Sequence, residues 1–315
     1  MNCLVTGAAG FIGSHLCEKL IDLGFSVIGI DSFTDYYSKQ LKEKNLASLF
    51  EKKRFEFIGQ DINQIDLEIL IKKSDCIFHL AAQAGVRTSW GENFSIYTKN
   101  NIESTQKILE ACKKNKIKKI VYASSSSVYG NTPDLPMKET SLLFPYSPYG
   151  VTKLAAENLC SLYHQNYGLP VVSLRYFTVY GPRQRPDMAF HKFLKSIGEN
   201  KTIEIYGTGE QTRDFTYIDD IAKANISAAE KGKPGEIYNL GGGIQHKLSD
   251  IFPLLQKICG KKVKIKKVNR QKGDVQHTYA DISKAKKDLQ YNPQIKLQEG
   301  LEREWDWIQD IYSFK

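Results

Sequence analysis

Two residues four positions apart could carry out proton-transfer chemistry. Tyr149 and Lys153 stand near the start of a segment with helical periodicity, so their side chains share one face of a helix. A free tyrosine has a pKa of about 10 and is a poor base at neutral pH. A neighbouring ammonium group favours the phenolate and moves that pKa toward the working range. The pair predicts a tyrosine base that removes a proton from an alcohol.

A run of four serines offers further hydroxyl groups. The apolar segment 117–123 indicates a buried strand and is followed by Ser124 to Ser127. From a strand end, Ser125 can hydrogen-bond the same substrate hydroxyl as Tyr149 and help to move its proton. We expect Ser125, Tyr149 and Lys153 to form the catalytic set. A tyrosine and a lysine at this spacing also recur by chance on surface helices, so the assignment depends on the elements that surround them.

The elements that must position these groups begin with a glycine-rich turn. An apolar run, 2–6, ends at Gly7, and apolar residues at helical spacing follow Gly13. Gly7 permits a tight turn, Gly10 lets a pyrophosphate approach the backbone, and Gly13 lets the helix pack against the strand. The free amides at the helix N-terminus then face the phosphates. This turn predicts a dinucleotide site.

The type of dinucleotide follows from the next strand. The run 25–30 ends at Asp31, whose carboxylate can accept hydrogen bonds from the adenosine ribose and repels a 2′-phosphate. We therefore expect NAD rather than NADP. Asp61, at the end of the third strand, either holds the adenine amino group or caps a helix. Ala81 and Ala82, after the fourth strand, let the backbone approach the cofactor, whereas His79 within that strand is interpreted as a core histidine.

Alternating strands and helices predict an α/β fold, a Rossmann-type doubly wound parallel sheet whose ligand lies at the carboxyl ends of the strands. Six strands are expected at 2–6, 25–30, 55–58, 76–80, 117–123 and 169–175, and 236–240 could join them. We expect one long helix at 95–115. From Tyr176 the alternation breaks down, which predicts a smaller α/β substrate-binding lobe. The cofactor domain is assigned to 1–176 plus about 211–243, and the lobe to about 177–210 and 244–315.

Composition limits the classes of partner and the location. The net charge of +9 comes from lysines scattered among acids on helices, which is typical of solvated faces and does not predict nucleic-acid binding. The six cysteines lack metal-ligand spacing, so we expect no metal and a reducing compartment. The first strand starts at residue 2, which leaves no room for a signal peptide, and no apolar run could span a bilayer. The expected location is the cytoplasm, with no membrane partner.

The chain resembles the extended short-chain dehydrogenases/reductases, and within them the NDP-sugar 4-epimerases. The resemblance runs from Thr6–Gly13 through Tyr149 and Lys153 to Arg213-Asp-Phe215 and Gly273-Asp274. Finer features are similar to UDP-glucuronate 4-epimerases, namely Asp35-Tyr-Tyr37, Gln83-Ala-Gly-Val-Arg87 and Arg175-Tyr-Phe-Thr-Val-Tyr-Gly-Pro-Arg-Gln-Arg-Pro-Asp-Met188.

This resemblance implies roles for individual residues. Tyr176 lines the nicotinamide site, Arg213 binds the diphosphate, and Met188–Phe190 with Ile205-Tyr206 flank uracil. Many relatives carry an arginine three residues before the Gly-Asp pair. We take Gln271 to stand at that position in this chain, so the resemblance does not supply a second arginine for the phosphates. The residues expected at the cofactor are Gly7, Gly10, Phe11, Ile12, Gly13, Asp31, Ser32, Asp61, Ile62, Leu80, Ala81, Ala82, Asn100, Tyr149, Lys153 and Tyr176. Those expected at the substrate are Gly85, Arg87, Ser125, Ser126, Ser127, Thr178, Arg185, Met188, Ala189, Phe190, Ile205, Tyr206, Arg213 and Asp274.

The residue types at this site suit an acidic sugar. The serines and Thr178 offer hydroxyl donors, and the guanidinium of Arg185 suits a carboxylate, although it could instead bind phosphate or form a surface ion pair. Related dehydratases carry Asp-Glu after the catalytic hydroxyl, where this chain has Ser126-Ser127, so dehydration is not expected. The expected reaction is epimerisation at carbon 4 of UDP-glucuronate by a homodimer. The alternatives are epimerisation of UDP-glucose or UDP-N-acetylglucosamine, and a catalytically silent NAD sensor.

Overall fold

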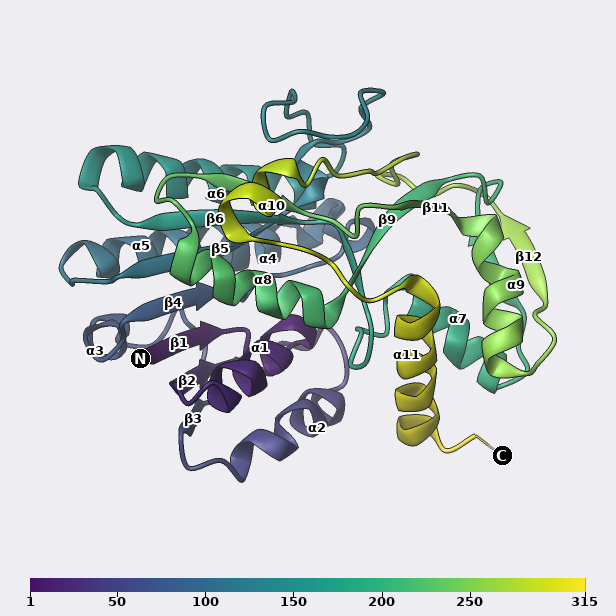
Figure 1. The fold of residues 1–315 in the computed structure, drawn as a ribbon, viewed down its shortest axis with the longest axis horizontal. Coiled ribbons are helices and arrows are strands. Elements are labelled where there is room, and N and C mark those ends of the chain that lie inside the picture. Colours follow the sequence, from purple (N-terminus) through teal and green to yellow (C-terminus); the bar gives the residue numbers. More distant parts are fainter. Residues whose placement is uncertain (315) are drawn as a thin grey trace.

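The computed structural model describes residues 1–314 and is organised around one parallel sheet of seven strands (Figure 1). The strand order is β10-β6-β5-β4-β1-β2-β3, and every neighbouring pair is parallel. The predicted doubly wound α/β fold is confirmed, and the run near 236–240 does enter the sheet. The strands are β1 (Asn2–Thr6), β2 (Ser26–Ile30), β3 (Phe55–Ile58), β4 (Cys76–His79), β5 (Lys119–Ser125), β6 (Val171–Tyr176) and β10 (Ile237–Leu240).

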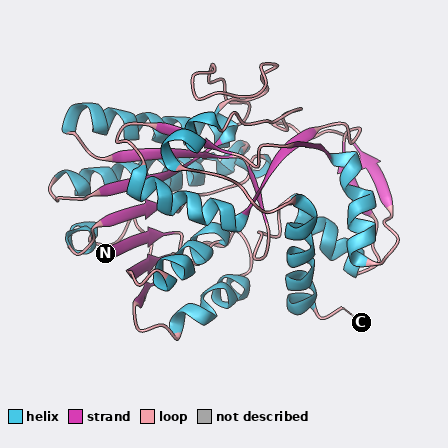
Figure 2. Ribbon diagram, in the orientation of Figure 1, coloured by secondary structure: helices cyan, strands magenta, loops and turns pink. Residues whose placement is uncertain are grey.

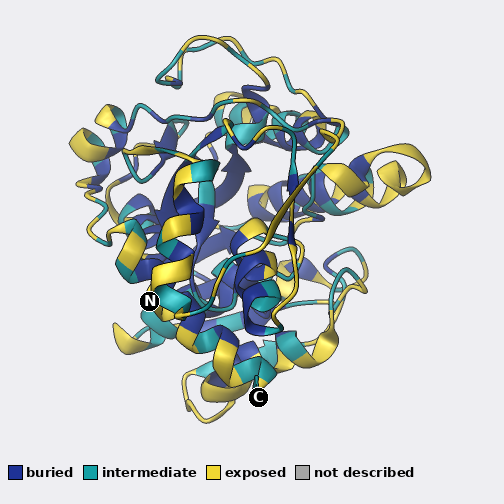
Figure 3. Ribbon diagram, turned by 90° about the vertical axis from the view of Figure 1, so that its right-hand side faces the viewer, coloured by how far each residue is buried: buried dark blue, intermediate teal, exposed yellow. Residues whose placement is uncertain are grey.

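Helices cover both faces of the sheet because successive strand residues point to opposite sides. Val5 packs into the layer that contains α1 (Phe11–Asp22), α2 (Lys39–Phe50) and α8 (Ile218–Lys231). Its neighbour Leu4 packs into the other layer, which contains α3 (Leu67–Lys72), α5 (Ser104–Lys113) and α6 (Pro148–Tyr167). Figure 3 shows the sheet buried in dark blue and the outward helix faces exposed in yellow. Two apolar layers therefore hold the strand ends in fixed positions.

The segment predicted as one long helix is divided into several pieces. After two 3₁₀ turns, η1 (Arg87–Ser89) and η2 (Gly91–Asn93), come α4 (Phe94–Tyr97), the π-helical segment η3 (Thr98–Glu103) and then α5. The wider π turn directs the side chain of Asn101 inward, where it is buried. Helical periodicity cannot reveal this, because a π segment inserts an extra residue without changing the residue types around it.

Beyond the carboxyl ends of the strands lie smaller sheets and helices (Figures 1 and 2). A three-stranded sheet is formed by β7 (Thr178–Tyr180), β9 (Thr212–Tyr217) and β11 (Gln245–Lys247). A parallel pair is formed by β8 (Ile203–Tyr206) and β12 (Ile265–Val268). The helices here are α7 (Ala189–Gly198), α9 (Leu248–Cys259) and α11 (Leu297–Tyr312), while α10 (Ser283–Leu289) packs on α8 and β10. The assigned domain boundaries stay a prediction.

Two further observations concern the chain's environment. No helix within residues 1–314 is both long and apolar enough to cross a membrane. All six cysteines are free thiols, and five of them are buried.

Candidate active site

The glycine-rich turn between β1 and α1 exposes backbone rather than side chains to the cavity at Gly7, Gly10 and Gly13. Gly7 has a φ of +73°, and a Cβ added to it would lie 2.9 Å from the backbone nitrogen of Ala81. A Cβ on Gly13 would collide with the carbonyl oxygen of Gly7. The turn can therefore follow this path only with glycine at both positions. The first amides of α1 open toward the cavity, which is the arrangement that suits a phosphate.

Asp31 is fixed at the end of β2 by two backbone amides. Its carboxylate oxygens accept hydrogen bonds from the amides of Ala9 at 3.1 Å and Phe33 at 2.9 Å. Burial raises the pKa of Asp31, although these bonds and the charge of Lys42 oppose the rise. Lys42, which sequence reasoning missed, is buried in α2 and donates to the carbonyl oxygen of Thr34 at 2.6 Å. A hydroxyl-rich ribose fits beside the carboxylate, whereas a 2′-phosphate meets its negative charge.

Every residue predicted at the cofactor lines one elongated cavity along the carboxyl ends of the strands. The cavity runs from the glycine turn and Asp31 to Tyr149, Lys153 and Tyr176. Asp61 lies on its wall, and Asp66 rather than Asp61 caps α3, so the helix-cap alternative is not realised. Free backbone amides suit the phosphates, the Asp31 carboxylate suits a ribose, and the alanines let the backbone come close to the ligand. Together these groups fit a dinucleotide. Residues that also line the cavity but were not predicted are Tyr36, Tyr37, Lys42, Gln83 and Ser124, among others, and Arg185, which was predicted at the substrate, lines this cavity as well.

Tyr149 and Lys153 are carried by the first turns of α6. The helix begins here because Pro148 occupies its first turn and the Ser147 hydroxyl accepts a hydrogen bond from the amide of Gly150 at 3.1 Å. Burial lowers the pKa of Lys153 to about 8, and its ammonium lies 4.6 Å from the centre of the Tyr122 ring. Lys153 is therefore held deep beneath the site.

The surroundings of Tyr149 include groups from other elements. Burial raises the pKa of Tyr149, and the strongest opposing influences are a hydrogen bond with Ser125 and the charge of Arg185. The Lys153 ammonium lies against the Tyr122 ring, and its expected effect on Tyr149, together with that of a cationic nicotinamide, stays a prediction. Arg185 lines the same cavity as Tyr149.

The four serines have different surroundings in the structure. Ser125 donates to the hydroxyl of Ser127 at 3.1 Å, and a hydrogen bond with Ser125 is among the influences that lower the pKa of Tyr149. Ser126 and Ser127 start the 3₁₀ turn η4 (Ser126–Val128). Ser125, Ser126 and Ser127 are not among the residues that line the cofactor cavity or the substrate cavity described below, and their contact with the substrate stays a prediction. Ser124, which was not predicted, faces the cofactor cavity and donates to Glu157 at 2.6 Å.

A second cavity lies beyond the first and faces β7, β8, β9 and α7. Its volume of about 920 Å³ is in the range that accommodates a compound of nucleotide size. The predicted substrate residues on its wall are Gly85, Arg87, Thr178, Met188, Ala189, Ile205, Tyr206, Arg213 and Asp274. Phe190 is a correction, since its side chain is 1% exposed and packs on Phe215 with ring centres 4.5 Å apart. We refer to this space as the substrate cavity.

Three arginines gather around Asp274 at the substrate cavity. Arg87 pairs with the carboxylate of Asp274 at 2.8 Å and lies 4.0 Å from the centre of the Tyr206 ring. Arg213 donates to the carbonyl oxygen of Val275 at 2.8 Å, and burial lowers its pKa to about 10. Arg270 donates to the backbone of Asp274 at 2.6 Å. The expectation based on Gln271 was therefore wrong, because Arg270, three residues before Gly273, supplies the further guanidinium. Such a cluster suits a diphosphate.

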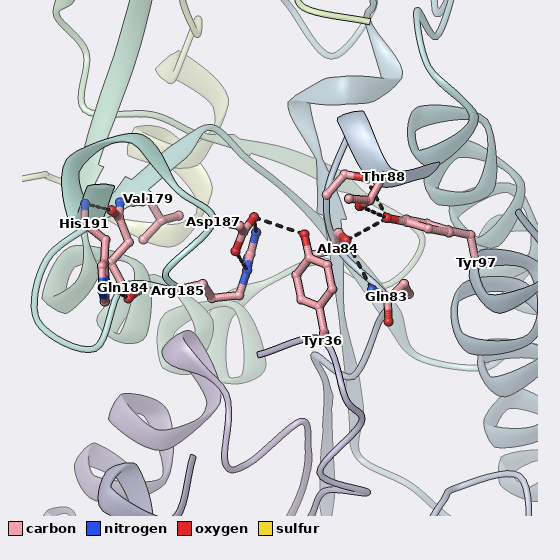
Figure 4. A network of polar contacts seen from close by, with 11 residues as sticks. Tyr36, Gln83, Ala84, Thr88, Tyr97, Val179, Gln184, Arg185, Asp187 and His191 are labelled. Carbon is pink, nitrogen blue, oxygen red and sulfur yellow. Dashed lines mark hydrogen bonds and ion pairs between the residues drawn. The ribbon is translucent and has the colours of Figure 1, made fainter. Parts of the chain in front are cut away.

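The Nε–Nη2 edge of the Arg185 guanidinium is already occupied by a carboxylate of the chain. Its Nε and Nη2 atoms donate to the two carboxylate oxygens of Asp187 at 2.9 and 3.0 Å. Tyr36 donates to the same carboxylate at 3.1 Å, as Figure 4 shows. Tyr36 lines both cavities, whereas Arg185 lines the cofactor cavity and Asp187 the substrate cavity. The three side chains therefore mark the place where the cavities meet, close to Tyr149.

Asn101 joins two parts of the site and was not predicted. Its side-chain oxygen accepts from the amide of Gln83 at 2.7 Å, and its nitrogen donates to the carbonyl of Gln83 at 3.0 Å and to the hydroxyl of Thr152 at 2.9 Å. The loop after β4 is thereby tied to the catalytic helix between Tyr149 and Lys153. A polar residue buried within a helical pattern was the one available signal.

His79 has the structural role that the sequence indicated. Its ring nitrogens hydrogen-bond the hydroxyls of Thr6 at 2.8 Å and Thr105 at 3.0 Å. Burial lowers its pKa to about 3, so it stays neutral in the core and cannot serve as a base for the substrate.

Comparison with known proteins places this geometry in a family. The model of the NAD dependent epimerase/dehydratase family matches residues 3–241. The chain belongs to this family. Two relatives span nearly the full length of this epimerase/dehydratase family member. It is 48% identical to the uncharacterized UDP-glucose epimerase YtcB of Bacillus subtilis, over 99% of each chain. It is 43% identical to a UDP-glucuronate 4-epimerase of Thermodesulfobacterium geofontis, over 98% of this chain and 96% of that protein.

A solved structure is similar throughout. The UDP-glucuronic acid 4-epimerase from Bacillus cereus, in complex with UDP-glucuronic acid and NAD, matches this family member with a TM-score of 0.96 and 50% identity. The match covers 99% of this chain and 100% of that one. The likeness therefore includes both cavities and the elements that form them.

Proposed function

We propose that this protein is an NAD-dependent UDP-glucuronate 4-epimerase, an isomerase that converts UDP-glucuronate to UDP-galacturonate. The observation that carries the proposal is the position of Tyr149, on the wall of a dinucleotide cavity close to where it meets a cavity lined by Arg87 and Arg213. Relatives with this activity by name share 43% and 50% of their residues with the chain over almost its whole length.

Each part of the site has a separate task in this proposal. The glycine turn and Asp31 hold NAD, which supplies the acceptor and later the donor of the hydride exchanged with carbon 4 of the sugar. Tyr149 removes the proton of the 4-hydroxyl while Ser125 hydrogen-bonds its phenol group. The charges of Arg185 and the buried Lys153 stabilise the phenolate.

The arginine cluster at the substrate cavity keeps the diphosphate in place during the reaction. Arg87, Arg213 and Arg270 bind the part of the substrate that does not react, so the keto sugar can turn without leaving the protein. The other face of carbon 4 is then reduced, and Tyr149 returns its proton. Because the hydride is given back, the protein should retain its cofactor between turnovers.

The proposal is tested by product analysis. Purified protein is incubated separately with UDP-glucuronate, UDP-glucose and UDP-N-acetylglucosamine, and the products are separated by chromatography. Formation of UDP-galacturonate at the highest kcat/KM supports the assignment. Conversion of a neutral sugar with UDP-glucuronate left unchanged would overturn it.

A second candidate is the epimerisation of UDP-glucose. The name of the Bacillus subtilis relative favours it, and so does the ion pair between Arg185 and Asp187, which leaves the junction of the cavities close to neutral. The same incubation decides between the two.

We also propose that the protein acts in the cytoplasm as a homodimer. Five buried free cysteines are consistent with a reducing compartment. Exposed apolar side chains on α4 and α6, such as Ile96 and Leu162, offer a surface for a second copy. Light scattering after size-exclusion chromatography should give about twice the chain mass of 35.8 kDa.

A further inference from the structure

The contact between Arg185 and Asp187 is the feature of the site that the proposed reaction leaves unused. Arg185 is half-buried and Asp187 is an exposed residue, with 23% and 33% of their side-chain surface exposed. Within residues 1–314, Asp187 is the one residue that accepts hydrogen bonds from the Arg185 guanidinium. The Nε–Nη2 edge of this guanidinium, which suits a carboxylate, is thus already filled by a carboxylate of the chain itself.

Asp187 is anchored independently of Arg185. Tyr36, from the loop after β2, donates its hydroxyl proton to Asp187 at 3.1 Å, and Figure 4 shows its ring standing beside the ion pair. The Tyr36 hydroxyl is packed against Gly85, where an added Cβ would collide with it. Asp187 also precedes the positive end of α7, which begins at Ala189. The Asp187 carboxylate can therefore stay in place when Arg185 moves. Within residues 1–314 the Arg185 guanidinium has no hydrogen-bond acceptor other than Asp187, and it lies 5.9 Å from the centre of the Tyr36 ring.

We propose that Asp187 determines sugar specificity by acting as an internal carboxylate that occupies Arg185 until the carboxylate of a uronate replaces it. This inference rests on the proposed function, because it requires an acidic sugar at the junction of the two cavities. A neutral sugar offers Arg185 nothing that competes with Asp187, so the ion pair stays closed around it. A uronate exchanges one carboxylate for another at Arg185, and the released Asp187 keeps its hydrogen bond from Tyr36.

Asp187 lowers the affinity for UDP-glucuronate because it competes with the substrate for Arg185. Binding a uronate requires the partly buried ion pair to open, so the observed affinity for UDP-glucuronate is lower than Arg185 alone would give. Neutralising Asp187 should remove that competition. The expected change is a tighter complex with the acidic sugar and no change with the neutral one.

The test compares Asp187→Asn with the wild-type holoenzyme by calorimetric titration with UDP-glucuronate and UDP-glucose. The variant should bind UDP-glucuronate about three- to tenfold more tightly and UDP-glucose within about twofold of the wild type. Weaker or unchanged binding of UDP-glucuronate would overturn the proposal, because Asp187 would then merely position Arg185.

A matched variant controls for charge in general. Asp35 is an exposed acid on the loop of Tyr36 and is not among the residues that line either cavity. Asp35→Asn should leave both affinities within about twofold, and an equal tightening by both variants would contradict a specific exchange. A crystal structure with UDP-glucuronate should place Arg185 beyond about 4 Å from Asp187, and one with UDP-glucose should keep the pair intact.

Failure of this proposal is distinguishable from failure of the proposed function. If the wild type does not convert UDP-glucuronate, the function is wrong whatever Asp187 does. If the wild type converts it and Asp187→Asn does not bind it more tightly, the exchange alone is wrong.

Discussion

At the scale of single residues, the environment of each charged or phenolic group decides its use. Burial raises the pKa of Tyr149 while Ser125 and Arg185 oppose that rise, so the tyrosine depends on partners from two other elements. Arg185 pairs with Asp187, and Asp31 is held by two amides. Residue types alone predicted these groups, but their partners follow from the fold.

The first prediction concerns the base. Tyr149→Phe should lower kcat by roughly 10²–10⁴-fold because the proton acceptor is lost, with UDP-glucuronate affinity nearly unchanged because the ring volume is kept. The kcat and the dissociation constant are measured on the same preparation. Turnover close to that of the wild type would show that another group removes the proton.

The second prediction concerns Arg185. Oxidation at carbon 4 of a glucuronate gives a β-keto acid, which loses carbon dioxide unless its carboxylate charge is held. Arg185→Ala should weaken UDP-glucuronate binding by roughly 1.5–3 kcal/mol, with little change for UDP-glucose. A decarboxylated 4-keto pentose should also appear beside UDP-galacturonate, as detected by mass spectrometry.

A neighbouring arginine provides the control for this variant. Arg183, in the same loop, pairs with Glu18 at 2.8 Å, and Arg183→Ala should not release carbon dioxide. Equal weakening of both sugars by Arg185→Ala, without carbon dioxide release, would assign Arg185 to the phosphates instead.

The third prediction concerns the choice of cofactor. The wild type should bind NAD at least about tenfold more tightly than NADP because the Asp31 carboxylate repels a 2′-phosphate. Asp31→Ser should narrow this ratio, since it frees the amides of Ala9 and Phe33 beside the charge of Lys42. Fluorescence titration with both cofactors measures the ratio, and Asp35→Ser, on the same loop, is the control. Equal affinities in the wild type would contradict the assignment.

At the scale of elements, a buried ion pair fastens the catalytic helix to the sheet. Glu157, one turn after Lys153 on α6, receives two hydrogen bonds from Arg175 on β6 at 2.6 and 3.0 Å and one from Ser124 on β5. Both members of the pair are 1% exposed. Helical and strand patterns predicted these elements within a few residues. They did not predict the ion pair, because Arg175 and Glu157 lie in strands and helices whose packing partners are set by the topology.

The fourth prediction follows from this pair. Glu157→Gln should lower the free energy of unfolding by roughly 3–5 kcal/mol because the guanidinium of Arg175 is left buried without its counter-ion. Urea unfolding measures the change. Glu68→Gln, which breaks an exposed pair with Lys114, should cost less than about 1 kcal/mol. A similar loss of unfolding free energy in the two variants would show that burial does not determine how much an ion pair contributes to stability.

At the scale of the whole molecule, buried titratable groups couple folding to pH. Burial lowers the pKa of His79 to about 3 and that of His191 to about 4, whereas it raises the pKa of Asp214 to about 7. Below about pH 6.5 the unfolded chain binds protons at both histidines, whereas the native state does not. The contribution of these two histidines to the free energy of unfolding therefore falls as the pH falls. Asp214 acts in the opposite direction between about pH 4 and 7, because the native state binds the proton that the unfolded state has lost.

The fifth prediction concerns the share of His79. Between pH 6 and 5 the unfolded chain binds a proton at His79 that the native state does not, so this residue alone makes the free energy of unfolding fall by about 1.4 kcal/mol for each unit by which the pH is lowered. Urea unfolding at pH 7.5, 6 and 5 gives the slope. His79→Gln should reduce the slope of the free energy of unfolding against pH by the contribution of one proton. An unchanged slope in that variant would show that His79 does not contribute to it.

Much of the molecule was predictable from its sequence, and the exceptions share a physical cause. The glycine turn, Asp31 and the Tyr149–Lys153 pair are local patterns, so their positions follow from strand and helix periodicity. Phe190 was assigned to the uracil site through the resemblance to the family, and an apolar residue suits a uracil site and a core equally well. Only packing against Phe215 decides between these two. The π-helical turn at Asn101 follows from packing that no spacing reveals. Arg185 and Asp187 are only two positions apart, and the ion pair was one of the alternatives for Arg185, but residue spacing did not decide among those alternatives.

The last strand of the sheet has a consequence for the chain's synthesis. β10 pairs with β6, yet about sixty residues of the chain separate them, so β6 keeps one open edge until residues 237–240 leave the ribosome. All six residues of β6 are buried in the finished protein. A nascent chain stalled before residue 237, or a truncated gene product, presents an apolar unpaired edge that invites pairing with other chains. Such fragments should aggregate or be held by chaperones rather than fold into a separate cofactor-binding unit.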